Sequence, residues 1–535
     1  MARIAPALAV AAALAAAAVL VSGGSSADPE TPPALPGQPS PFLGTAVAGS
    51  GGLTAAIDAY GSVVDLRPAG PAGEAAIDNP QARQTAGTVP SDTGIVLRVG
   101  SGSAHLPLWR ADRVGQSYLP GTNVVRTTAR VGAIGATILD AAAPAAPALV
   151  RRIIVDGPAG SPVSLSANVN LSAGRGATCL SDPRGRRRGG EEGRAVLIGW
   201  RSSGSLRVDL TCSFGRTRSA AGVIDRAVAA DRSWLRRARP LGASAPNWAK
   251  RLYARSLLVL RALTDRRSGA VAAGARDGWA YVWPRDAGAV AIAFAAAGYR
   301  SEASRVARFL GGLDLDAGPR FGGDGAAVED GRALQGDAAG WVAAAARAAG
   351  HRRPVARFGW RDRADYGERS GDRGDYLANA IAAGAPAAAI RREFGAGSLL
   401  VRRADDPASG TDAAAAWAVR PFPRPPLFAE VRASLDRLLA AGGRFGIAPA
   451  EDWPGEEAWS APTAWAGWGL AALGERRDAL RLLAALERAA TGPGTLPERV
   501  DPRSGIARST TPLAWSHAFA ILALRELWPG RPVHG

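Results

Sequence analysis

The stretch Val163-Ser164-Leu165-Ser166-Ala167-Asn168-Val169 places an apolar side chain at every second position. Alternation with a period of two is typical of a β-strand that buries one face and leaves the other face polar. Similar runs occur at residues 53–57, 95–99, 124–128 and 206–210, and Gly, Pro, Asn and Asp separate them. Short strands with frequent turn signals predict an antiparallel β-sandwich, which we place at residues 42–218.

The pattern changes near residue 219, where apolar residues begin to recur at a spacing of three and four. This spacing predicts amphipathic helices. We expect a helical linker at 219–244, broken by the prolines between 240 and 246, and an all-helical domain at 245–530. Many consecutive helices with short connections indicate stacked helical hairpins, either closed into a ring or left as a bundle. The predicted helices cover 219–239, 247–264, 287–297, 303–310, 338–349, 377–389, 427–440, 462–473, 477–490 and 512–527.

The N-terminus has the pattern of an export signal. Arg3 precedes an Ala/Leu/Val run over about residues 7–21, and small residues follow it up to Ala27. Such a run is short for a membrane span but typical of a signal-peptide core. We predict a signal peptide at 1–27, a Pro-rich linker at 28–41 and a secreted protein without stable membrane insertion, an uncleaved anchor being the alternative. Export makes a disulfide between the only two cysteines, Cys179 and Cys212, plausible, with two separate thiols as the alternative.

The charge balance is strongly basic, with 64 Lys+Arg against 47 Asp+Glu and a net charge of +17. Lys250 is the only lysine, so the charge is almost entirely arginine. The densest basic run, residues 184–188, has no interleaved aromatic residues and is interpreted as a solvated loop rather than a phosphate-binding patch. We therefore expect no nucleic-acid partner. With two cysteines and four scattered histidines, we expect neither a metal site nor another cofactor.

Tryptophan is concentrated in the helical half. Several of these residues stand beside acidic residues in segments between helices: Trp279, Trp283, Trp453 and Trp459. Aromatic rings next to carboxylates predict a pocket with flat apolar walls and polar groups between them. Such a pocket suits a sugar, because the C–H faces of the sugar stack on rings and its hydroxyls bind charged groups.

Two segments carry candidate chemistry. Gly278-Trp279-Ala280-Tyr281-Val282-Trp283-Pro284-Arg285-Asp286 precedes a predicted helix and offers a forked donor beside an acceptor. Gly494-Thr495-Leu496-Pro497-Glu498-Arg499 comes before Ser509-Thr510-Thr511-Pro512-Leu513-Ala514-Trp515-Ser516-His517-Ala518. In the latter, Thr511 and Pro512 have the residue types of a helix N-cap and first position, which places Glu498 in a loop that leads into a helix.

Together these segments resemble glycoside hydrolase family 15, the glucoamylase and glucodextranase family, over roughly residues 247–527. The segments around Gly331-Arg332-Ala333-Leu334-Gln335-Gly336-Asp337 and Trp453-Pro454-Gly455-Glu456-Glu457-Ala458-Trp459 resemble further family segments. The resemblance implies an (α/α)6 toroid after the β-sandwich. It also implies exo-acting, inverting hydrolysis that releases glucose from the non-reducing ends of α-glucans or α-gluco-oligosaccharides.

The resemblance also assigns residues. Glu498 is the expected general base, although Arg499 replaces the glutamine that is usual after it. Glu368, in Asp365-Tyr366-Gly367-Glu368, is the expected general acid; Gly367 stands where the family has tryptophan, and a shift of one residue would put Gly367 at the acid position instead. The expected substrate-binding residues are Tyr281, Trp283, Arg285, Asp286, Glu457 and Trp459.

Two other functions remain open. The irregular segment at residues 365–368 is compatible with a carbohydrate-binding protein on a catalytically degenerate glycosidase scaffold. A trehalase-like hydrolase could use the same motifs. The sequence does not distinguish the glycosidic linkage or the oligomeric state.

Overall fold

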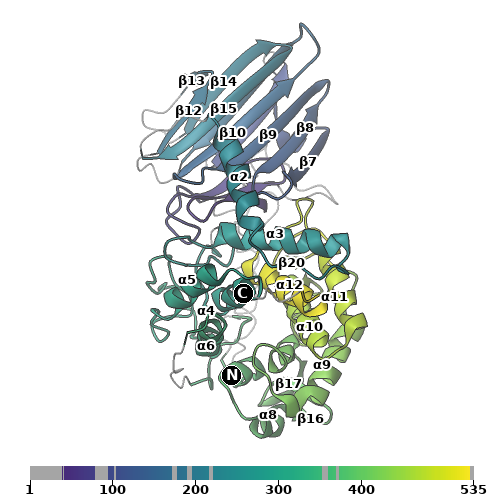
Figure 1. The fold of residues 1–535 in the computed structure, drawn as a ribbon. Helices are drawn as coiled ribbons and strands as arrows, with labels where there is room; N and C mark the ends of the chain where they lie inside the picture. The colour runs from purple at the N-terminus through teal and green to yellow at the C-terminus, as the bar shows by residue number, and fades with distance from the viewer. Residues whose placement is uncertain are drawn as a thin grey trace, which may run out of the picture.

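The computed structural model describes residues 39, 41, 43–78, 94–101, 104–171, 177–188, 195–215, 221–276, 278–351, 359–368 and 373–530. The predicted signal peptide, and the predicted linker apart from residues 39 and 41, lie outside this part of the chain. Two antiparallel sheets form the upper part of the molecule in Figure 1, and helices form the lower part.

The strands between Gly44 and Phe214 form two large sheets. The nine-stranded sheet has the order β1-β2-β3-β5-β11-β14-β13, with β4 beside β3 and β6 beside β5, and the six-stranded sheet has the order β12-β15-β10-β9-β8-β7. Alternate side chains of both sheets meet in one apolar core that includes Leu97, Ile153 and Leu165. The strands are β1 (Gly44–Gly49), β2 (Thr54–Asp58), β3 (Val63–Arg67), β4 (Ile77–Asp78), β5 (Gly94–Ser101), β6 (Ala104–Pro107), β7 (Arg113–Tyr118), β8 (Val125–Val131), β9 (Ile134–Ala142), β10 (Ala148–Asp156), β11 (Pro162–Asn170), β12 (Ala177–Asp182), β13 (Arg186–Arg188), β14 (Ala195–Ser203) and β15 (Ser205–Phe214).

The end of the sandwich that carries both cysteines confirms one prediction and corrects another. Cys179 and Cys212 face each other on β12 and β15 and form a disulfide. The basic run is not entirely a loop, because its last three residues pair with β14 as the edge strand β13. These arginines are exposed, and a strand at a sheet edge can carry solvated charges without losing its ladder.

The helices agree closely with the predicted ranges, with two corrections. The predicted helix at 377–389 is two helices, because Gly384 has a positive φ of 88° and Pro386 precedes the second helix. The last helix begins at Ala514 and not at Pro512, since the backbone of Leu513, the residue before the helix, is extended. The helices are α2 (Val223–Leu235), α3 (Asn247–Leu263), α4 (Pro284–Ala296), α5 (Arg300–Leu310), α6 (Ala338–Ala348), α7 (Leu377–Ala382), α8 (Ala387–Phe394), α9 (Phe428–Ala441), α10 (Ser460–Ala472), α11 (Arg476–Ala489) and α12 (Ala514–Leu527), with the 3-10 segment η3 (Ala413–Ala418).

Six buried helical segments contact one another in a closed cycle, α4-α6-α7-η3-α10-α12 and back to α4. Small residues permit this packing: a Cβ at Gly340 of α6 would lie 2.2 Å from the carbonyl oxygen of Ala382 on α7. Further helices cover the cycle from outside, with α3 on α12, α5 on α4, α8 on α7, α9 on η3 and α11 on α10. In the described residues between α6 and α7 no outer helix occurs.

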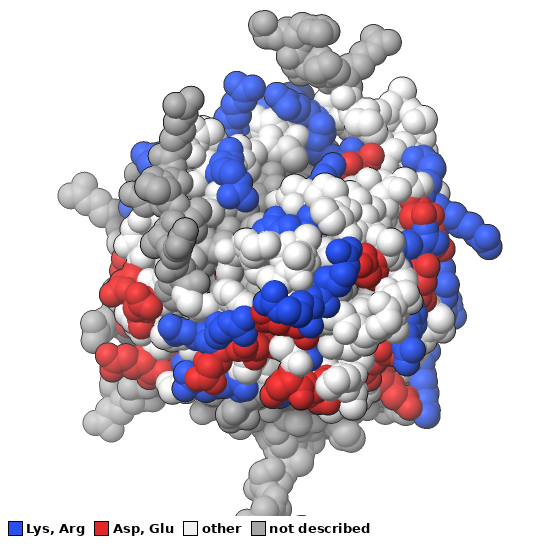
Figure 2. Space-filling view, turned by 90° about the horizontal axis from the view of Figure 1, so that it is seen from below, with Lys and Arg blue, Asp and Glu red and all other residues white. Residues whose placement is uncertain are grey.

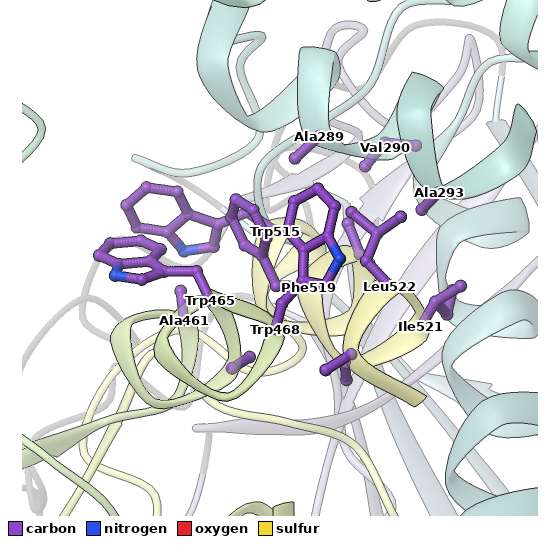
Figure 3. Close-up of a cluster of buried hydrophobic side chains, with 14 of the residues drawn as sticks. Ala289, Val290, Ala293, Ala461, Trp465, Trp468, Trp515, Phe519, Ile521 and Leu522 are labelled. Carbon is purple, nitrogen blue, oxygen red and sulfur yellow. The ribbon is translucent and has the colours of Figure 1, made fainter. Parts of the chain in front are cut away.

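Aromatic rings fill the centre of the cycle. Figure 3 shows Trp465 and Trp468 of α10 and Trp515 and Phe519 of α12, facing Ala289 of α4. The ring centroids of Trp465 and Trp515 lie 5.3 Å apart in an edge-to-face arrangement, which aromatic quadrupoles favour. The cycle is therefore packed solid at its middle, and any pocket must lie at one of its ends.

Buried polar contacts join the sheets to the helices. The Asn123 side chain, before β8, donates to the carbonyl of Leu258 on α3 at 2.8 Å and accepts from Arg255 at 3.0 Å. Thr495, in the loop that carries Glu498, donates to the carbonyl of Thr45 on β1 at 2.5 Å. The sandwich thus supports the loop of the predicted base directly.

Charge is distributed unevenly over the molecule. Figure 2 views the helical end, where arginines and carboxylates are interspersed without a patch of one sign. The positive net charge therefore does not gather on this face. Among the residues that the structure describes, no helix has the length and apolarity that crossing a membrane requires.

Candidate functional site

A pocket of about 360 Å³ opens at the N-terminal ends of three inner helices. Trp283 precedes α4, Trp459 precedes α10 and Leu513 precedes α12, and all three line the pocket. The structure brings every predicted site residue to this pocket except Glu457. The lining comprises Ala273, Gly278, Trp279, Tyr281, Trp283, Arg285, Asp286, Arg320, Arg332, Tyr366, Gly367, Glu368, Trp459, Glu498, Leu513 and Trp515.

Glu457 lies beside the pocket rather than in its lining. Its carboxylate accepts a hydrogen bond from Arg499 at 2.6 Å. Glu457 immediately precedes β19 (Ala458–Trp459), which pairs with β20 (Arg499–Val500). This two-stranded ladder fixes Trp459 next to the loop of Glu498.

Glu498 is held in the pocket wall with its carboxylate nearly buried. Its Oε1 accepts from the indole of Trp279 at 3.2 Å, its Oε2 accepts from the hydroxyl of Ser509, and its side chain is 13% exposed. Burial raises the pKa of Glu498 above the ordinary glutamate value, while the bonds from Ser509 and Trp279 and the nearby charge of Arg499 oppose the rise. Glu498 is therefore a fixed carboxyl whose exposed part faces the cavity.

His517 of α12 anchors the loop that carries Glu498. Its Nε2 accepts from the amide of Leu496 at 2.9 Å, and its Nδ1 lies 2.9 Å from the hydroxyl of Ser256 on α3. Since Nε2 must accept, the proton of the neutral ring resides on Nδ1 and is donated to Ser256. Burial, with a smaller effect of Arg255, lowers the pKa of His517 to about 3.

We expect this histidine to make the fold less stable in acid. The folded pKa of about 3 lies below the ordinary value of 6.5, so the unfolded chain binds more protons between these limits. The stabilising contribution is complete above pH 6.5 and is lost as the pH falls toward 3, by about 3 kcal/mol at pH 4. The measurement is Tm against pH for the wild type and for His517→Gln, which keeps an acceptor and does not titrate.

The difference between these two curves is the informative quantity, because other buried groups act in the opposite sense. Burial raises the pKa of Asp286 and of Asp412 to about 7, so their contributions fall as the pH rises from about 4 through 7. These contributions cancel in the difference. Parallel curves from pH 7 to pH 4 would contradict the assignment of a neutral, buried His517.

Glu368 also lines the pocket. The arginines that contact it lie far from it in the sequence. Its Oε1 accepts from Gln335 and its Oε2 from Arg332, and Nη2 of Arg285 lies 3.8 Å from Oε1. Arg373, a neighbour along the chain, instead contacts Asp362. Glu368 has a positive φ of 49°, which is uncommon outside glycine and costs about 1–3 kcal/mol where the surrounding structure imposes it.

A buried ion-pair network holds the segment of Glu368 in this conformation. The carboxylate of Asp365 accepts from the amide of Gly367 at 2.8 Å and from Arg402 at 2.6 Å. Tyr366 donates to Asp412 at 2.8 Å, and Arg402 Nε lies 3.9 Å from the same carboxyl. Because Arg402 is wholly buried among these acids, residues 365–368 are rigidly placed.

Arg285 and Asp286 differ in what they offer a ligand. The guanidinium of Arg285 is already hydrogen-bonded within the protein, since its Nη1 donates to Gln335 at 2.7 Å and to Asp337 at 3.0 Å. Asp286 lies in the first turn of α4, is 4% exposed and lines the cavity. Burial raises its pKa to about 7, with Glu368 and Glu498 contributing and Arg285 opposing. Near neutral pH this carboxyl can therefore either donate to or accept from a hydroxyl group.

The pocket walls are aromatic, as the tryptophan distribution predicts. Trp283 and Tyr281 stand on one side, where Arg320 covers both rings at 5.2 Å and 4.4 Å. Trp459 lies opposite Trp453, with ring centroids 5.1 Å apart, but Trp453 itself does not line the cavity. Its ring lies against the segment of Glu368.

Four lining residues are not among the site residues predicted from the sequence: Arg320, Arg332, Tyr366 and Trp515. Tyr366 and Trp515 stand within segments that were quoted, so their neighbours already indicated them. Arg332 also stands within a quoted segment, whereas Arg320, in the same long connection between α5 and α6, has nothing in its local sequence that indicates the pocket. Among the described residues there is no group of three or more His, Cys, Asp or Glu side chains that could hold a metal ion.

No family model matches the sequence, and no curated protein matches it. A solved bacterial glucoamylase in complex with acarbose matches the structure with a TM-score of 0.66, covering 93% of this chain and 96% of that one at 13% identity. The chain has the fold of a bacterial glucoamylase. A glycosidase with 21% identity covers 52% of the chain with a TM-score of 0.45, and the glucoamylase of Saccharomycopsis fibuligera, with 13% identity, covers 54% with a TM-score of 0.42.

Proposed function

We propose that the protein is an exo-acting, inverting glycoside hydrolase that releases glucose from the non-reducing ends of α-glucans or α-gluco-oligosaccharides. One observation carries the proposal: two glutamates from distant segments, Glu368 and Glu498, line one aromatic-walled pocket together with Asp286. The volume of about 360 Å³ lies near the lower end of the roughly 300–1,000 Å³ typical of small-molecule sites, which favours recognition of one chain end.

In this mechanism Glu368 is the acid and Glu498 the base. Glu368, when protonated, donates its proton to the glycosidic oxygen as the bond from that oxygen to the anomeric carbon breaks. Glu498, ionised, takes a proton from a water molecule whose oxygen forms the new bond on the opposite face. An inverting pair needs about 6.5–9.5 Å between the carboxyls to leave space for this water. Trp279 and Ser509 aim the carboxylate of Glu498 and leave it fixed for the attack.

The sugar itself must displace one contact of Glu368. Arg332 donates to its Oε2, and this guanidinium is 40% exposed at the pocket mouth. It moves aside when a substrate enters, which frees one oxygen to carry the proton. Asp286 then binds hydroxyls of the terminal sugar, and Trp283 and Trp459 provide stacking surfaces.

The same observations support the wider proposals. The fold shared with a bacterial glucoamylase supports membership of glycoside hydrolase family 15, and the cycle of inner helices supports an (α/α)6 toroid at residues 245–530. The disulfide supports export by the signal peptide at 1–27, because such bonds persist in oxidising compartments.

A second candidate is a sugar-binding protein on a degenerate scaffold. The observation that favours it is the irregular acid segment. Gly367 precedes Glu368 there, and Arg332 donates a hydrogen bond to the carboxylate of Glu368. In this case saccharides bind at Asp286 and Trp283 and no product forms.

A substrate panel separates these candidates. We expect glucose from maltotriose or isomaltotriose, measured by chromatography after prolonged incubation, with binding measured by calorimetry. Glucose from trehalose alone would instead favour the trehalase-like hydrolase. Binding without any product would contradict the hydrolase and support the sugar-binding protein.

Gly367 provides a test of how the acid is positioned. A Cβ at this position would lie 2.8 Å from the ring of Trp453 and 3.1 Å from Oδ1 of Asp365. Gly367→Ala should therefore shift the segment of Glu368 and lower turnover by about tenfold to a hundredfold, as small misplacements of reacting groups do. The measurement is kcat on maltotriose.

The matched control is Gly359→Ala, because a Cβ at this exposed glycine would meet nothing within 4 Å. We expect the control to retain wild-type turnover. The double variant Gly367→Ala, Trp453→Leu should recover part of the lost turnover, because the smaller leucine side chain leaves room for the added Cβ. Full activity of Gly367→Ala alone would show that the Trp453 contact does not position Glu368.

A further inference from the structure

A second cavity, of about 740 Å³, lies at the β13 edge of the nine-stranded sheet, away from the pocket of Glu498. Ser166, Gly199 and Arg201 contribute to it from the outer face of that sheet, whereas Leu165, Trp200 and Leu206 belong to the core between the two sheets. Strands β6, β11, β13, β14 and β15 contribute to it, together with the turn that enters β13. Its lining comprises His105, Leu165, Ser166, Pro183, Arg184, Arg186, Arg188, Leu197, Gly199, Trp200, Arg201 and Leu206.

The strand register explains why cations gather there. Leu165 belongs to the core, so the next residue, Ser166, faces the other side of the sheet. Ser166 pairs with Gly199 on β14, and Gly199 pairs with Arg186 on β13. Two small residues, Ser166 and Gly199, therefore stand side by side in this row next to Arg186 at the edge, and they form a floor beside the cation.

Neighbouring rows repeat the pattern. Arg188 pairs with Leu197, and Arg201 pairs with Ser164. Residues two apart on one strand lie about 7 Å from each other, and adjacent strands about 4.8 Å. The face thus presents arginines on neighbouring rows and strands, beside Leu197, which is 41% exposed.

These cations are not neutralised by described residues. Arg184, Arg186, Arg188 and Arg201 are exposed, and none of them forms an ion pair with a described carboxylate. The part of the cavity lining that the structure describes contains no Asp or Glu. Most arginines around the catalytic pocket, by contrast, are paired with acids, as Arg332 is with Glu368 and Asp330. Among the described residues, the hollow thus holds a cluster of like charge without a carboxylate partner, which favours an anionic ligand.

We propose that this outer face binds an anionic polysaccharide with a carboxylate on its sugar rings, a polyuronate. Guanidinium groups match carboxylates in a planar, two-bond geometry, and the small floor residues let a flat sugar chain approach the sheet. A nucleic acid fits less well, because Trp200, the one Trp, Tyr or Phe among the described lining residues, is 5% exposed and offers no open ring for base stacking. The site shares no residue with the catalytic pocket, so the proposal is independent of hydrolysis.

The test measures binding of polygalacturonate to the full chain by calorimetry at low and moderate salt, with neutral dextran and double-stranded DNA as comparison polymers. The triple variant Arg186→Gln, Arg188→Gln, Arg201→Gln should bind polygalacturonate about tenfold to a hundredfold more weakly than the wild type, with a shallower salt dependence. The matched control is Arg113→Gln, Arg126→Gln, Arg130→Gln, which removes the same charge from exposed positions on the six-stranded sheet.

Retained binding in the control, with loss in the triple variant, supports the proposal. Equal weakening in both variants would show a net-charge effect and overturn it. Tighter binding of DNA than of polygalacturonate would also overturn it in favour of a nucleic-acid partner. Turnover of maltotriose by the triple variant should equal that of the wild type, which separates this outcome from a failure of the hydrolase proposal.

Discussion

Glu498→Gln is expected to lower turnover of maltotriose by about 10²–10⁴-fold, because the amide cannot take a proton from the attacking water. The substitution keeps the shape of the side chain and can preserve the contacts with Trp279 and Ser509. Substrate binding should therefore change much less than kcat. Initial rates and calorimetric affinities, measured on the same preparation, check both parts of the prediction.

The pH dependence of kcat in the wild type provides a second test of Glu498 as the base. The base must be ionised, and burial raises the pKa of Glu498. The pH at which kcat falls on acidification should therefore lie above 4.5, the pKa of an ordinary glutamate. Glu456→Gln is the control, because this exposed carboxyl lies outside the pocket lining. If Glu498→Gln retained wild-type turnover, Glu498 could not be the base.

Glu368→Gln is expected to lower turnover of maltotriose by a similar 10²–10⁴-fold, but only where the leaving group needs a proton. Fluoride leaves without protonation, so α-glucosyl fluoride should be hydrolysed by this variant at a rate much closer to that of the wild type. Glu498→Gln should lose both activities. The ratio of the two rates in each variant therefore separates the acid from the base.

Equal losses on both substrates in Glu368→Gln would contradict its role as the acid. They would indicate instead that Glu368 only fixes Arg332 and Gln335, with which it shares hydrogen bonds. Absence of any turnover in the wild type, together with sugar binding, would favour the degenerate scaffold.

The fold was predictable wherever side-chain periodicity is dictated by burial. The alternation at residues 163–169 marks β11 because one face of that strand lies in the core. The amphipathic outer helices were equally clear. The run at 413–418 was not assigned, since its six buried residues are almost all alanine and show no period. The hairpin of β17 (Leu399–Arg403) and β18 (Asp406–Thr411) was missed because its charged residues are typical of a loop.

The site was predictable where several of its residues are close together in one segment of the sequence. Trp283, Arg285 and Asp286 lie together at the start of α4, and helix geometry alone brings them to the pocket. The partners of Glu368 were not predictable, because Arg332 is 36 residues away and approaches through the tertiary fold. The ring of Trp453 against Gly367 is a contact of the same kind.

The central claim is that two carboxyls act from opposite faces of the sugar, and the anomeric form of the first product tests it most directly. Proton NMR during early hydrolysis of maltotriose distinguishes the two forms before they interconvert. The account predicts β-glucose as the first sugar released, since water attacks opposite the leaving group. α-Glucose as the first product would contradict it.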